Sequence, residues 1–384
     1  MTSLRTPPVS TDDIATLQAD LAEGWGVPST WYFDPDHYAF ELGAITKRSW
    51  LLFAPVHQLN DPGDTVTGHV GDVPVVVVRG SDGALRGFVN LCRHRGYTVA
   101  TQSGKCSVLT CRYHSWTYNL DGTLRAAPNS KDEPGFDKSA LSLIPVAVDV
   151  LGPAVFVNLD ADAPPLAQAH PRLAQMMQAA GVETDPDYYL ESYNVVREIE
   201  YDFASNWKLW YDNNTECYHC PTIHSGTFGE AFETLPGSFG YDEMDKLMIF
   251  AFHPDIKRAE PGKMRARKQN AFQIYPGATI MLQDDILLLH QAQPTGPETT
   301  TKRMFCLTRN AGDQDMAHKW IELWNQTFKE DQGATQIQQA GLRSGQMPRA
   351  RYVPSQEQAT VYVNKLTLDA YAAAARHAVQ EAAE

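Results

Sequence analysis

The feature that most constrains this chain is a pair of short cysteine–histidine segments. Cys92-Arg93-His94 and Cys111-Arg112-Tyr113-His114 are separated by sixteen residues. Two thiolates can hold one iron of a [2Fe–2S] cluster while two neutral imidazoles hold the other, and the imidazoles raise the reduction potential above that of an all-cysteine cluster. The spacing therefore predicts that Cys92, His94, Cys111 and His114 bind such a cluster.

Tetrahedral zinc is the alternative for a set of two cysteines and two histidines. Zinc fingers, however, usually place two Cys first and two His about a dozen residues later. Here each segment supplies one residue of each type, which lets each loop reach both irons. We therefore expect iron rather than zinc.

The composition is that of an ordinary globular protein. The chain has 384 residues, 43% of them hydrophobic and 20% charged, which is enough for two domains with buried cores. No run of about eighteen apolar residues occurs, so we expect no membrane span, and the N-terminus lacks the features of a secretory signal. Six cysteines do not suggest a disulfide scaffold, and we expect a cytoplasmic location.

The net charge of −14 argues against nucleic acid or an anionic membrane as the main partner. The region from Arg86 to Arg125 differs, because it contains six basic residues and a single acid, Asp121. This local charge of +5 lies in a chain whose remainder carries −19. It is either ordinary solvated loop charge or a surface that steers an acidic electron donor.

Strand signals dominate the region around the two segments. Val73–Arg79 is β-branched and apolar, and Ser81-Asp82-Gly83 reads as a turn before a second alternating run. The clearest linker is Asp160–Pro165. We therefore predict an all-β cluster domain over 45–160, with 1–44 and 161–384 forming a second domain.

The second domain mixes helical and strand patterns. Ser10 is expected to cap an N-terminal helix. The later pattern predicts helices near 166–180, 205–219, 313–341 and 356–379, and strands near 193–201, 271–274, 286–293 and 303–307. This order indicates an antiparallel sheet covered by helices, which makes the whole chain α+β.

A second metal site is indicated in the segment NWKLWYDNNTECYHCPTIH at 206–224. It contains His219 and His224, with Glu216 three residues before the first. Two imidazoles and one carboxylate with open positions form the facial triad of non-heme Fe(II) oxygenases. The third ligand must come from later in the chain, where a helical segment offers Glu330 and Asp331.

Other residues of this segment receive structural interpretations. Cys217 and Cys220 flank His219, but no second thiolate pair lies nearby, so packing is favoured over zinc binding. Lys208, Tyr211 and Tyr218 are expected to have structural or hydrogen-bonding roles.

The strings CRHRG at 92–96 and CRYHSWTYNLDG at 111–122 resemble the Rieske cluster loops of ring-hydroxylating oxygenase α subunits. The resemblance implies an all-β Rieske domain joined to a helix-grip catalytic domain, and a head-to-tail homotrimer. It also implies that Asp331 is the third ligand of a mononuclear iron beside His219 and His224. In this chain, the resemblance implies that electrons pass between the two metal centres of neighbouring subunits through His114, Glu216 and His219.

Most of this family has Asp where this chain has Glu216. The longer side chain and the string NNTECYHC look like the subgroup that oxidises quaternary ammonium compounds, such as glycine betaine and carnitine monooxygenases. Oxygenases that act on aromatic acids stay open as the alternative. A cationic substrate would need an aromatic cage, for which the sequence offers Trp207, Trp210, Tyr211 and Phe228.

The resemblance implies a terminal oxygenase that uses O₂ to hydroxylate or N-demethylate a small organic substrate. Hydroxylation or cis-dihydroxylation of an aromatic compound is the alternative, and a Rieske electron carrier is the alternative of another class. The chain has neither a Gly-x-Gly-x-x-Gly fingerprint nor a plant-type ferredoxin cysteine array. We therefore expect electrons from NAD(P)H through a separate reductase or ferredoxin.

Overall fold

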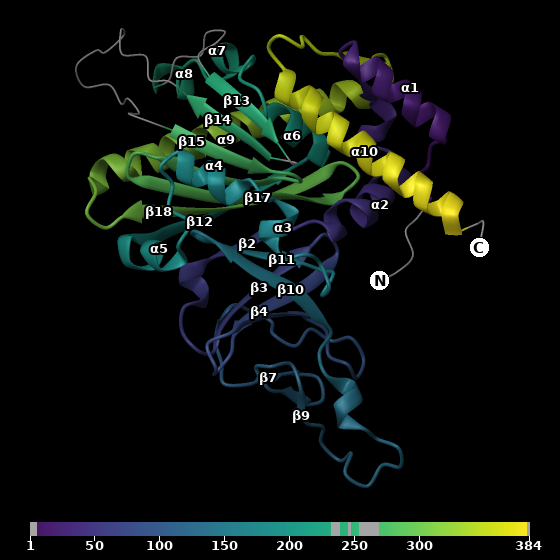
Figure 1. The fold of residues 1–384 in the computed structure, drawn as a ribbon, viewed down its shortest axis with the longest axis vertical. Coiled ribbons are helices and arrows are strands. Elements are labelled where there is room, and N and C mark those ends of the chain that lie inside the picture. The colour runs from purple at the N-terminus through teal and green to yellow at the C-terminus, as the bar shows by residue number, and fades with distance from the viewer. Residues whose placement is uncertain (1–5, 232–238, 245–246, 253–268, 382–384) are drawn as a thin grey trace. The chain divides into compact units, whose positions relative to one another are not determined.

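The computed structural model describes residues 6–231, 239–244, 247–252 and 269–381 (Figure 1). The chain divides into two compact units. Unit 1 contains residues 1–46, 170–182 and 193–384, and unit 2 contains residues 47–169 and 183–192. The predicted domain boundaries near 45 and 160 stay a prediction, because compactness alone does not show that a segment folds independently. No helix in the described ranges is long and apolar enough to cross a membrane.

Unit 2 is built on β-structure. A seven-stranded sheet has the order β2-β11-β10-β5-β4-β3-β6, and a three-stranded sheet has the order β7-β8-β9. The strands are β2 Leu51–Pro55, β3 Asp64–Val70, β4 Val73–Arg79, β5 Leu85–Val89, β6 Gly104–Lys105, β7 Leu109–Thr110, β8 Thr117–Tyr118, β9 Leu124–Ala126, β10 Pro145–Leu151 and β11 Ala154–Asn158. Short helices α3 (Leu166–Ala169) and α5 (Pro186–Ser192) complete the unit.

Unit 1 contains an antiparallel sheet with helices. The seven strands have the order β12-β18-β17-β16-β15-β14-β13. Their bounds are β12 Tyr193–Phe203, β13 Phe239–Met244, β14 Leu247–Phe252, β15 Gln269–Ile274, β16 Ala278–Gln283, β17 Ile286–Gly296 and β18 Thr299–Arg309. A separate pair joins β1 (Trp25–Pro28) to β19 (Arg349–Arg351).

The helices of unit 1 come from both ends of the chain and from its middle. They are α1 Thr11–Ala22, α2 Pro35–Ala44, α4 Leu173–Ala179, α6 Trp207–Asn214, α7 Cys220–Ile223, α8 Phe228–Ala231, α9 Gln314–Arg343 and α10 Gln358–Glu381. α9 contacts β12, β17 and β18, and α1 lies along α10 (Figure 1). The predicted α+β fold class is confirmed, including the capped first helix, where Ser10 accepts a hydrogen bond from the Asp13 amide.

Two predicted helices are shorter than expected. The stretch near 166–180 is divided into α3 and α4, because Pro171 disfavours helical geometry at the residue before it. The helix predicted over 205–219 ends at Asn214, where Asn213 and Asn214 are weak helix formers. This early end leaves Glu216 and His219 on a loop between α6 and α7.

A buried ion pair anchors α6, which leads into that loop. Lys208 on α6 and Glu41 on α2 are only 2% and 1% exposed. Lys208 Nζ donates to both Glu41 carboxylate oxygens at 2.8 and 2.7 Å, and to the Trp31 carbonyl oxygen at 3.0 Å. Glu41 also accepts from Trp207 Nε1 and from the Tyr371 hydroxyl of α10. The expected structural role of Lys208 therefore has a definite partner.

Removing only the lysine should be costly. Lys208→Met leaves the Glu41 carboxylate buried without its counter-ion, and we expect a loss of about 3–5 kcal/mol in the free energy of unfolding. Thermal and urea unfolding of the variant measure this loss. Lys365→Met is the control, because its exposed i,i+4 pair with Asp369 should contribute about 0–1 kcal/mol. Equal effects of the two substitutions would contradict the structural role of the Glu41–Lys208 pair.

Candidate functional site

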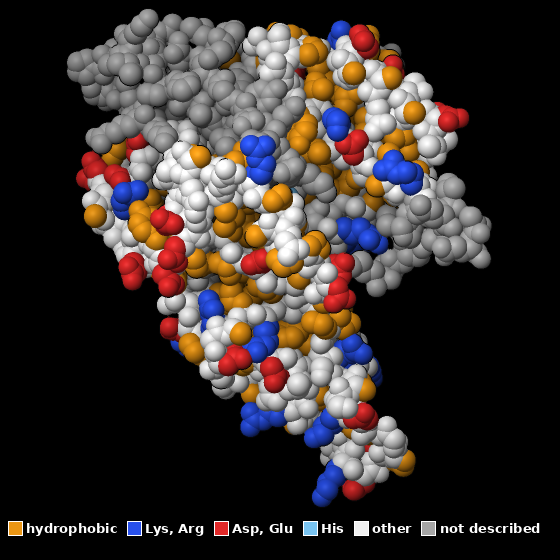
Figure 2. All heavy atoms as spheres, viewed as in Figure 1, with side chains coloured by type: hydrophobic (Ala, Val, Ile, Leu, Met, Phe, Trp, Pro, Cys, Tyr) orange, Lys and Arg blue, Asp and Glu red, His pale blue; other side chains and the backbone are white. Residues whose placement is uncertain are grey.

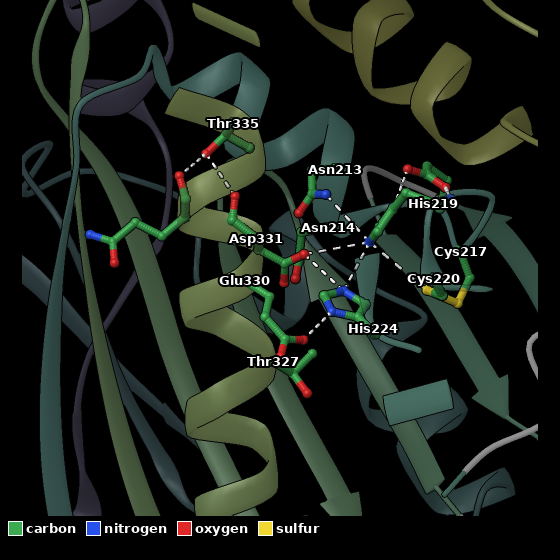
Figure 3. Close-up of polar contacts among 12 residues, drawn as sticks. Asn213, Asn214, Cys217, His219, Cys220, His224, Thr327, Glu330, Asp331 and Thr335 are labelled. Carbon is green, nitrogen blue, oxygen red and sulfur yellow. Dashed lines mark hydrogen bonds and ion pairs between the residues drawn. A yellow bond between two sulfur atoms is a disulfide. The ribbon is translucent and has the colours of Figure 1, made fainter. Parts of the chain in front are cut away.

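Three electron-pair donors converge in unit 1. His219 Nε2 and His224 Nε2 lie 3.2 Å apart, and Asp331 Oδ1 lies 3.4 Å from the first and 3.0 Å from the second. Figure 3 shows the three side chains pointing toward one another, two from the segment around α7 and one from α9. Asp331 and His224 are buried. The structure therefore brings together the three predicted iron ligands.

The spacing of these atoms fits a shared metal ion. Two ligands at right angles around an ion with bonds of about 2.1 Å are separated by about 3 Å. The three measured separations, 3.0–3.4 Å, lie close to this value. Two imidazoles and one carboxylate on one side of an ion leave its other positions open, which is the arrangement of non-heme Fe(II) oxygenases.

Carboxylates fix the orientation of both imidazoles from the opposite side. His219 Nδ1 lies 2.5 Å from Glu216 Oε1, and His224 Nδ1 lies 2.8 Å from Glu330 Oε2. The Thr227 hydroxyl also donates to Glu330 Oε2, at 2.7 Å. Because an ionised carboxylate only accepts, each Nδ1 carries a proton, and the Nε2 atoms are directed at Asp331. Glu330, an alternative third ligand by sequence, instead orients His224.

The electrostatics of the cluster favour a cation between the three side chains. Burial lowers the pKa of His219, but hydrogen bonds with Asp331 and Glu216 outweigh it and raise the pKa to about 10. Burial raises the pKa of Asp331, but hydrogen bonds with His219 and His224 lower it to about 2. The point where the three atoms meet therefore attracts positive charge.

The local sequence explains how two histidines five residues apart can meet. Pro221 lies in the first turn of α7, a position that suits its fixed φ. The four-residue helix then turns the chain, and His224 closes it through a hydrogen bond from its amide to the Cys220 carbonyl. His219 and His224 thus lie at opposite ends of one helical turn.

Cys217 and Cys220 are buried in the hydrophobic core of unit 1, as expected of packing residues, but the interpretation missed their covalent link. The two cysteines, which lie on either side of His219 in the sequence, form a disulfide in the structure (Figure 3). The local reason is the turn that brings the Cys220 amide to the Cys217 carbonyl at 3.3 Å, which places the two side chains together. The other cysteines, Cys92, Cys106, Cys111 and Cys306, are free.

A cavity of about 70 Å³ opens beside the three donors. α8 contributes Phe228, and α9 contributes Trp324 and Phe328. The Trp324 ring contacts both other rings, with its centroid 5.3 Å from that of Phe228 and 5.6 Å from that of Phe328. The sheet contributes polar side chains from β15, β16 and β17. Of the four aromatic residues suggested by the sequence as a cation cage, only Phe228 lines this cavity. Trp324 and Phe328 were missed, although they precede Asp331 at helical spacing.

A larger recess lies on the outer side of the same loop. Its volume is about 560 Å³, and Glu216 and His219 line both this recess and the inner cavity. Glu357 and the exposed side chains of Tyr218 and Ile223 also line it. Glu216 and His219 therefore border both spaces.

The two cluster loops of unit 2 have matching backbone turns. The Cys92 amide donates to the Tyr97 carbonyl, and the Gly96 amide donates back to the Cys92 carbonyl. In the second loop, Cys111 makes the corresponding bonds with Trp116 and Ser115. Gly96 and Ser115 occupy the same position in each turn, with φ of 73° and 59°. This left-handed geometry closes each loop around its cysteine.

The four predicted cluster ligands separate by type. Cys92 and Cys111 are buried, whereas His94 and His114 are exposed, with ring centroids 4.7 Å apart. This arrangement fits a [2Fe–2S] cluster with its thiolate iron inside and its imidazole iron at the surface. The Tyr118 hydroxyl lies 3.3 Å from Cys92 Sγ, a contact of the kind that tunes cluster potentials.

The basic region between Arg86 and Arg125 is smaller than the sequence count suggested. Arg86 pairs with Asp82, which lies just before the counted segment, and Lys105 pairs with Asp61. On the face of unit 2 seen in Figure 2, Lys and Arg side chains lie among acidic ones and form no continuous patch. The basic residues nearest the cluster histidines in sequence are Arg93, Arg95 and Arg112, all exposed.

Two family models cover most of the chain. Residues 49–146 match the Rieske [2Fe-2S] domain, and residues 190–373 match the catalytic domain of the ring hydroxylating alpha subunit. The chain belongs to the Rieske-type ring-hydroxylating oxygenase α-subunit family. Membership implies a [2Fe–2S] cluster and a mononuclear iron, and the catalytic-domain match argues against an electron carrier.

The relatives of this chain include quaternary ammonium monooxygenases. It is 34% identical over 204 residues to the carnitine monooxygenase oxygenase subunit of Acinetobacter baumannii, covering 53% of each chain. It is 37% identical over 220 residues to the glycine betaine monooxygenase oxygenase subunit of Chromohalobacter salexigens, covering 57% of this chain and 46% of the relative. The chain thus spans about half the length of these curated relatives. The predicted resemblance to their subgroup is confirmed.

Solved structures share the fold of this chain over most of its length. The quaternary ammonium Rieske monooxygenase CntA, in complex with an inhibitor, matches with a TM-score of 0.82 and 25% identity, over 96% of this chain and all of that one. Naphthalene 1,2-dioxygenase from Rhodococcus sp. matches with a TM-score of 0.78 at 18% identity, over 94% of this chain and 98% of that one. The second likeness shows the fold alone.

Proposed function

We propose that this chain is a terminal oxygenase that hydroxylates or oxidatively N-demethylates a small quaternary ammonium compound. The observation that carries the proposal is the position of the His219, His224 and Asp331 cluster beside a small cavity with three aromatic rings. Aromatic faces attract quaternary ammonium groups. The similarity to carnitine and glycine betaine monooxygenases supports the same substrate class.

In this proposal, His219, His224 and Asp331 hold Fe(II). When bound, the iron would supply O₂ activation at the open positions that a facial triad leaves. Glu216 and Glu330 keep the two imidazoles protonated at Nδ1 and directed at the metal position. The rings of Phe228, Trp324 and Phe328 exclude water from the reacting side of the cavity.

Cys92, His94, Cys111 and His114 are the proposed ligands of the [2Fe–2S] cluster. The overall reaction consumes O₂, two electrons and two protons, inserts one oxygen atom into a substrate C–H bond and releases the other as water. With an N-methyl group, the hydroxymethyl product loses formaldehyde and leaves the demethylated amine. Electrons would come from NAD(P)H through a separate reductase or ferredoxin, and exposed Arg93, Arg95 and Arg112 provide positive charge for an acidic donor.

We further propose a homotrimer in which the two cluster loops of one copy enter the recess of the next. Tyr97 and Tyr113 are 44% and 51% exposed on these loops, and Tyr218 is 56% exposed at the recess. Large exposed aromatic side chains of this kind mark interaction surfaces. His114 of the entering copy would then meet Glu216, which already contacts His219, so the carboxylate would join the two imidazoles.

The iron ligands can be tested by metal content. Asp331→Asn should lose most of the mononuclear iron, because one anionic ligand is removed, while Glu330→Gln should weaken iron binding by about 10–100-fold through His224. Iron per chain measures the loss, and the visible absorption of the cluster should stay unchanged in both. Glu322→Gln, exposed on the same helix, is the matched control. Full iron occupancy in Asp331→Asn would refute its role as a ligand.

The role of Glu216 can be separated from metal binding. Glu216→Gln should keep a cluster that dithionite reduces and most of the mononuclear iron, yet form at least about 10-fold less product. Single-turnover product yield against iron content measures the difference. Glu357→Gln lines the same recess as a control without a contact to His219. Near-normal turnover in Glu216→Gln would exclude the bridging role.

The substrate class can be tested with the reconstituted enzyme and a suitable reductase. Quaternary ammonium compounds should yield formaldehyde or hydroxylated product in proportion to O₂ and NAD(P)H consumed. Trp324→Leu should reduce the affinity for these compounds by about 5–30-fold, the effect expected from losing one cation–π contact of about 1–2 kcal/mol. Products from aromatic acids alone would favour the aromatic-hydroxylase alternative instead.

A further inference from the structure

A row of polar side chains crosses the sheet at the cavity. Gln273 on β15 pairs directly with Thr279 on β16, which pairs directly with His290 on β17. Cross-strand partners point to the same face, with Cβ atoms about 4.5–5.5 Å apart. All three side chains are buried, and all three line the cavity. The row therefore forms a continuous polar surface in the same cavity as the aromatic rings of α8 and α9, and the His290 ring contacts the Phe328 ring with centroids 5.5 Å apart.

Each member of the row has an unused hydrogen-bonding atom. Among the described residues, Gln273 Oε1, Thr279 Oγ1 and His290 Nδ1 have no partner. The Gln273 amide is held in place by its Nε2, which donates to the Asn214 carbonyl at 2.6 Å. Buried polar atoms are rarely left unsatisfied in folded proteins. Several such atoms on residues that line one cavity therefore indicate a surface suited to a polar ligand group.

The row offers two donors, and a buried lysine lies beside it, whose pKa burial lowers well below its ordinary value. Lys302 on β18 pairs with Ala292, two residues along β17 from His290, so it lies on the same face of the sheet. Its Nζ has no hydrogen-bond partner in the part of the chain that the structure describes. It lies 4.2 Å from the Trp210 ring centroid and 2.8 Å from that of Phe328. The hydroxyl of Thr279, the imidazole of His290 when its proton is on Nδ1, and the amino group of Lys302 thus lack an acceptor, whereas Gln273 Oε1 is itself an acceptor.

The opposite side of the cavity has the complementary character. Trp324, Phe328 and Asp331 follow one another on α9 at spacings of four and three residues, which places them on one helix face. That face therefore presents apolar ring surface next to the iron ligand. A ligand lying across the cavity would meet ring faces and the metal position on the helix side, and donors on the sheet side.

We propose that the donors of this row, Thr279 and His290, bind a carboxylate of the substrate, so that the chain selects carboxylated quaternary ammonium compounds over quaternary ammonium alcohols. A carboxylate supplies up to four acceptor sites and no donor, which matches the unused donors. Its negative charge would also favour the charged form of the neighbouring Lys302, which burial disfavours. The inference rests on the proposed function for the ammonium end of the substrate and assigns the opposite end to named side chains.

Four small ligands separate the two ends. Glycine betaine and choline carry the ammonium with and without a carboxylate. In 3,3-dimethylbutanoate and 3,3-dimethylbutan-1-ol, an uncharged carbon replaces the ammonium nitrogen of glycine betaine and of choline, respectively. Calorimetric affinities for the full-length holoenzyme without reductant require no turnover. We expect each acid to bind at least about 10-fold more tightly than its alcohol. Equal affinities of acid and alcohol would overturn the carboxylate assignment.

Variants connect this preference to the row. Thr279→Val removes the hydroxyl at nearly constant volume and should reduce the acid-to-alcohol affinity ratio at least about threefold, with His290→Leu as an independent second variant. Thr279→Ser should keep the ratio, and Met281→Leu changes the same cavity without a donor as a control. Because each ratio is internal to one protein, reduced folding yield does not affect it. Unchanged ratios in both Thr279→Val and His290→Leu would overturn the assignment.

The design distinguishes the two proposals. Tighter binding of glycine betaine than of 3,3-dimethylbutanoate tests the ammonium end, and tighter binding of each acid than of its alcohol tests the carboxylate end. Loss of the first preference with the second intact would refute the proposed substrate class and leave the row as a carboxylate site. Failure of all four ligands to bind would refute both.

Discussion

The catalytic unit depends on holding three electron-pair donors within 3.4 Å of one another in a buried place. Such atoms repel unless a cation or proton lies between them, so the surrounding chain must oppose their separation. It does so from several directions: Glu216 and Glu330 hold the far nitrogens of the imidazoles, and α9 holds Asp331. The disulfide and the helical turn of α7 shorten the loop that carries both histidines.

Much of the chemistry could be predicted from the sequence because it depends on local spacing. The cysteine and histidine spacing at 92–94 and 111–114 indicated mixed cluster ligation, and His219 with His224 indicated a second metal. Asp331 was reached through a resemblance, since an acid on a helix gives no local signal by itself. That its neighbour Glu330 contacts His224 depends on how α9 is rotated against the loop, which sequence patterns do not specify.

The cavity walls were the least predictable part, for physical reasons. β15 is buried on both faces, so Gln269–Ile274 lacks the alternation that shows which side chains face the core. The row of Gln273, Thr279 and His290 depends on the registers of two strand pairings, both of them with β16, a strand that the sequence did not indicate. The disulfide between Cys217 and Cys220 likewise depends on a turn at Cys217–Cys220 inside a segment that was expected to be helical.

One face of α9 carries both an iron ligand and two cavity rings, and this limits how the cavity can change. Rotating or shifting the helix to reshape Trp324 or Phe328 would also displace Asp331, because all three follow one helical stripe. Strands β15–β17, which line the same cavity, carry none of the proposed metal ligands. Divergence toward new substrates is therefore easiest through substitutions on β15–β17, because α9 combines a metal ligand and a hydrophobic wall that cannot be moved separately.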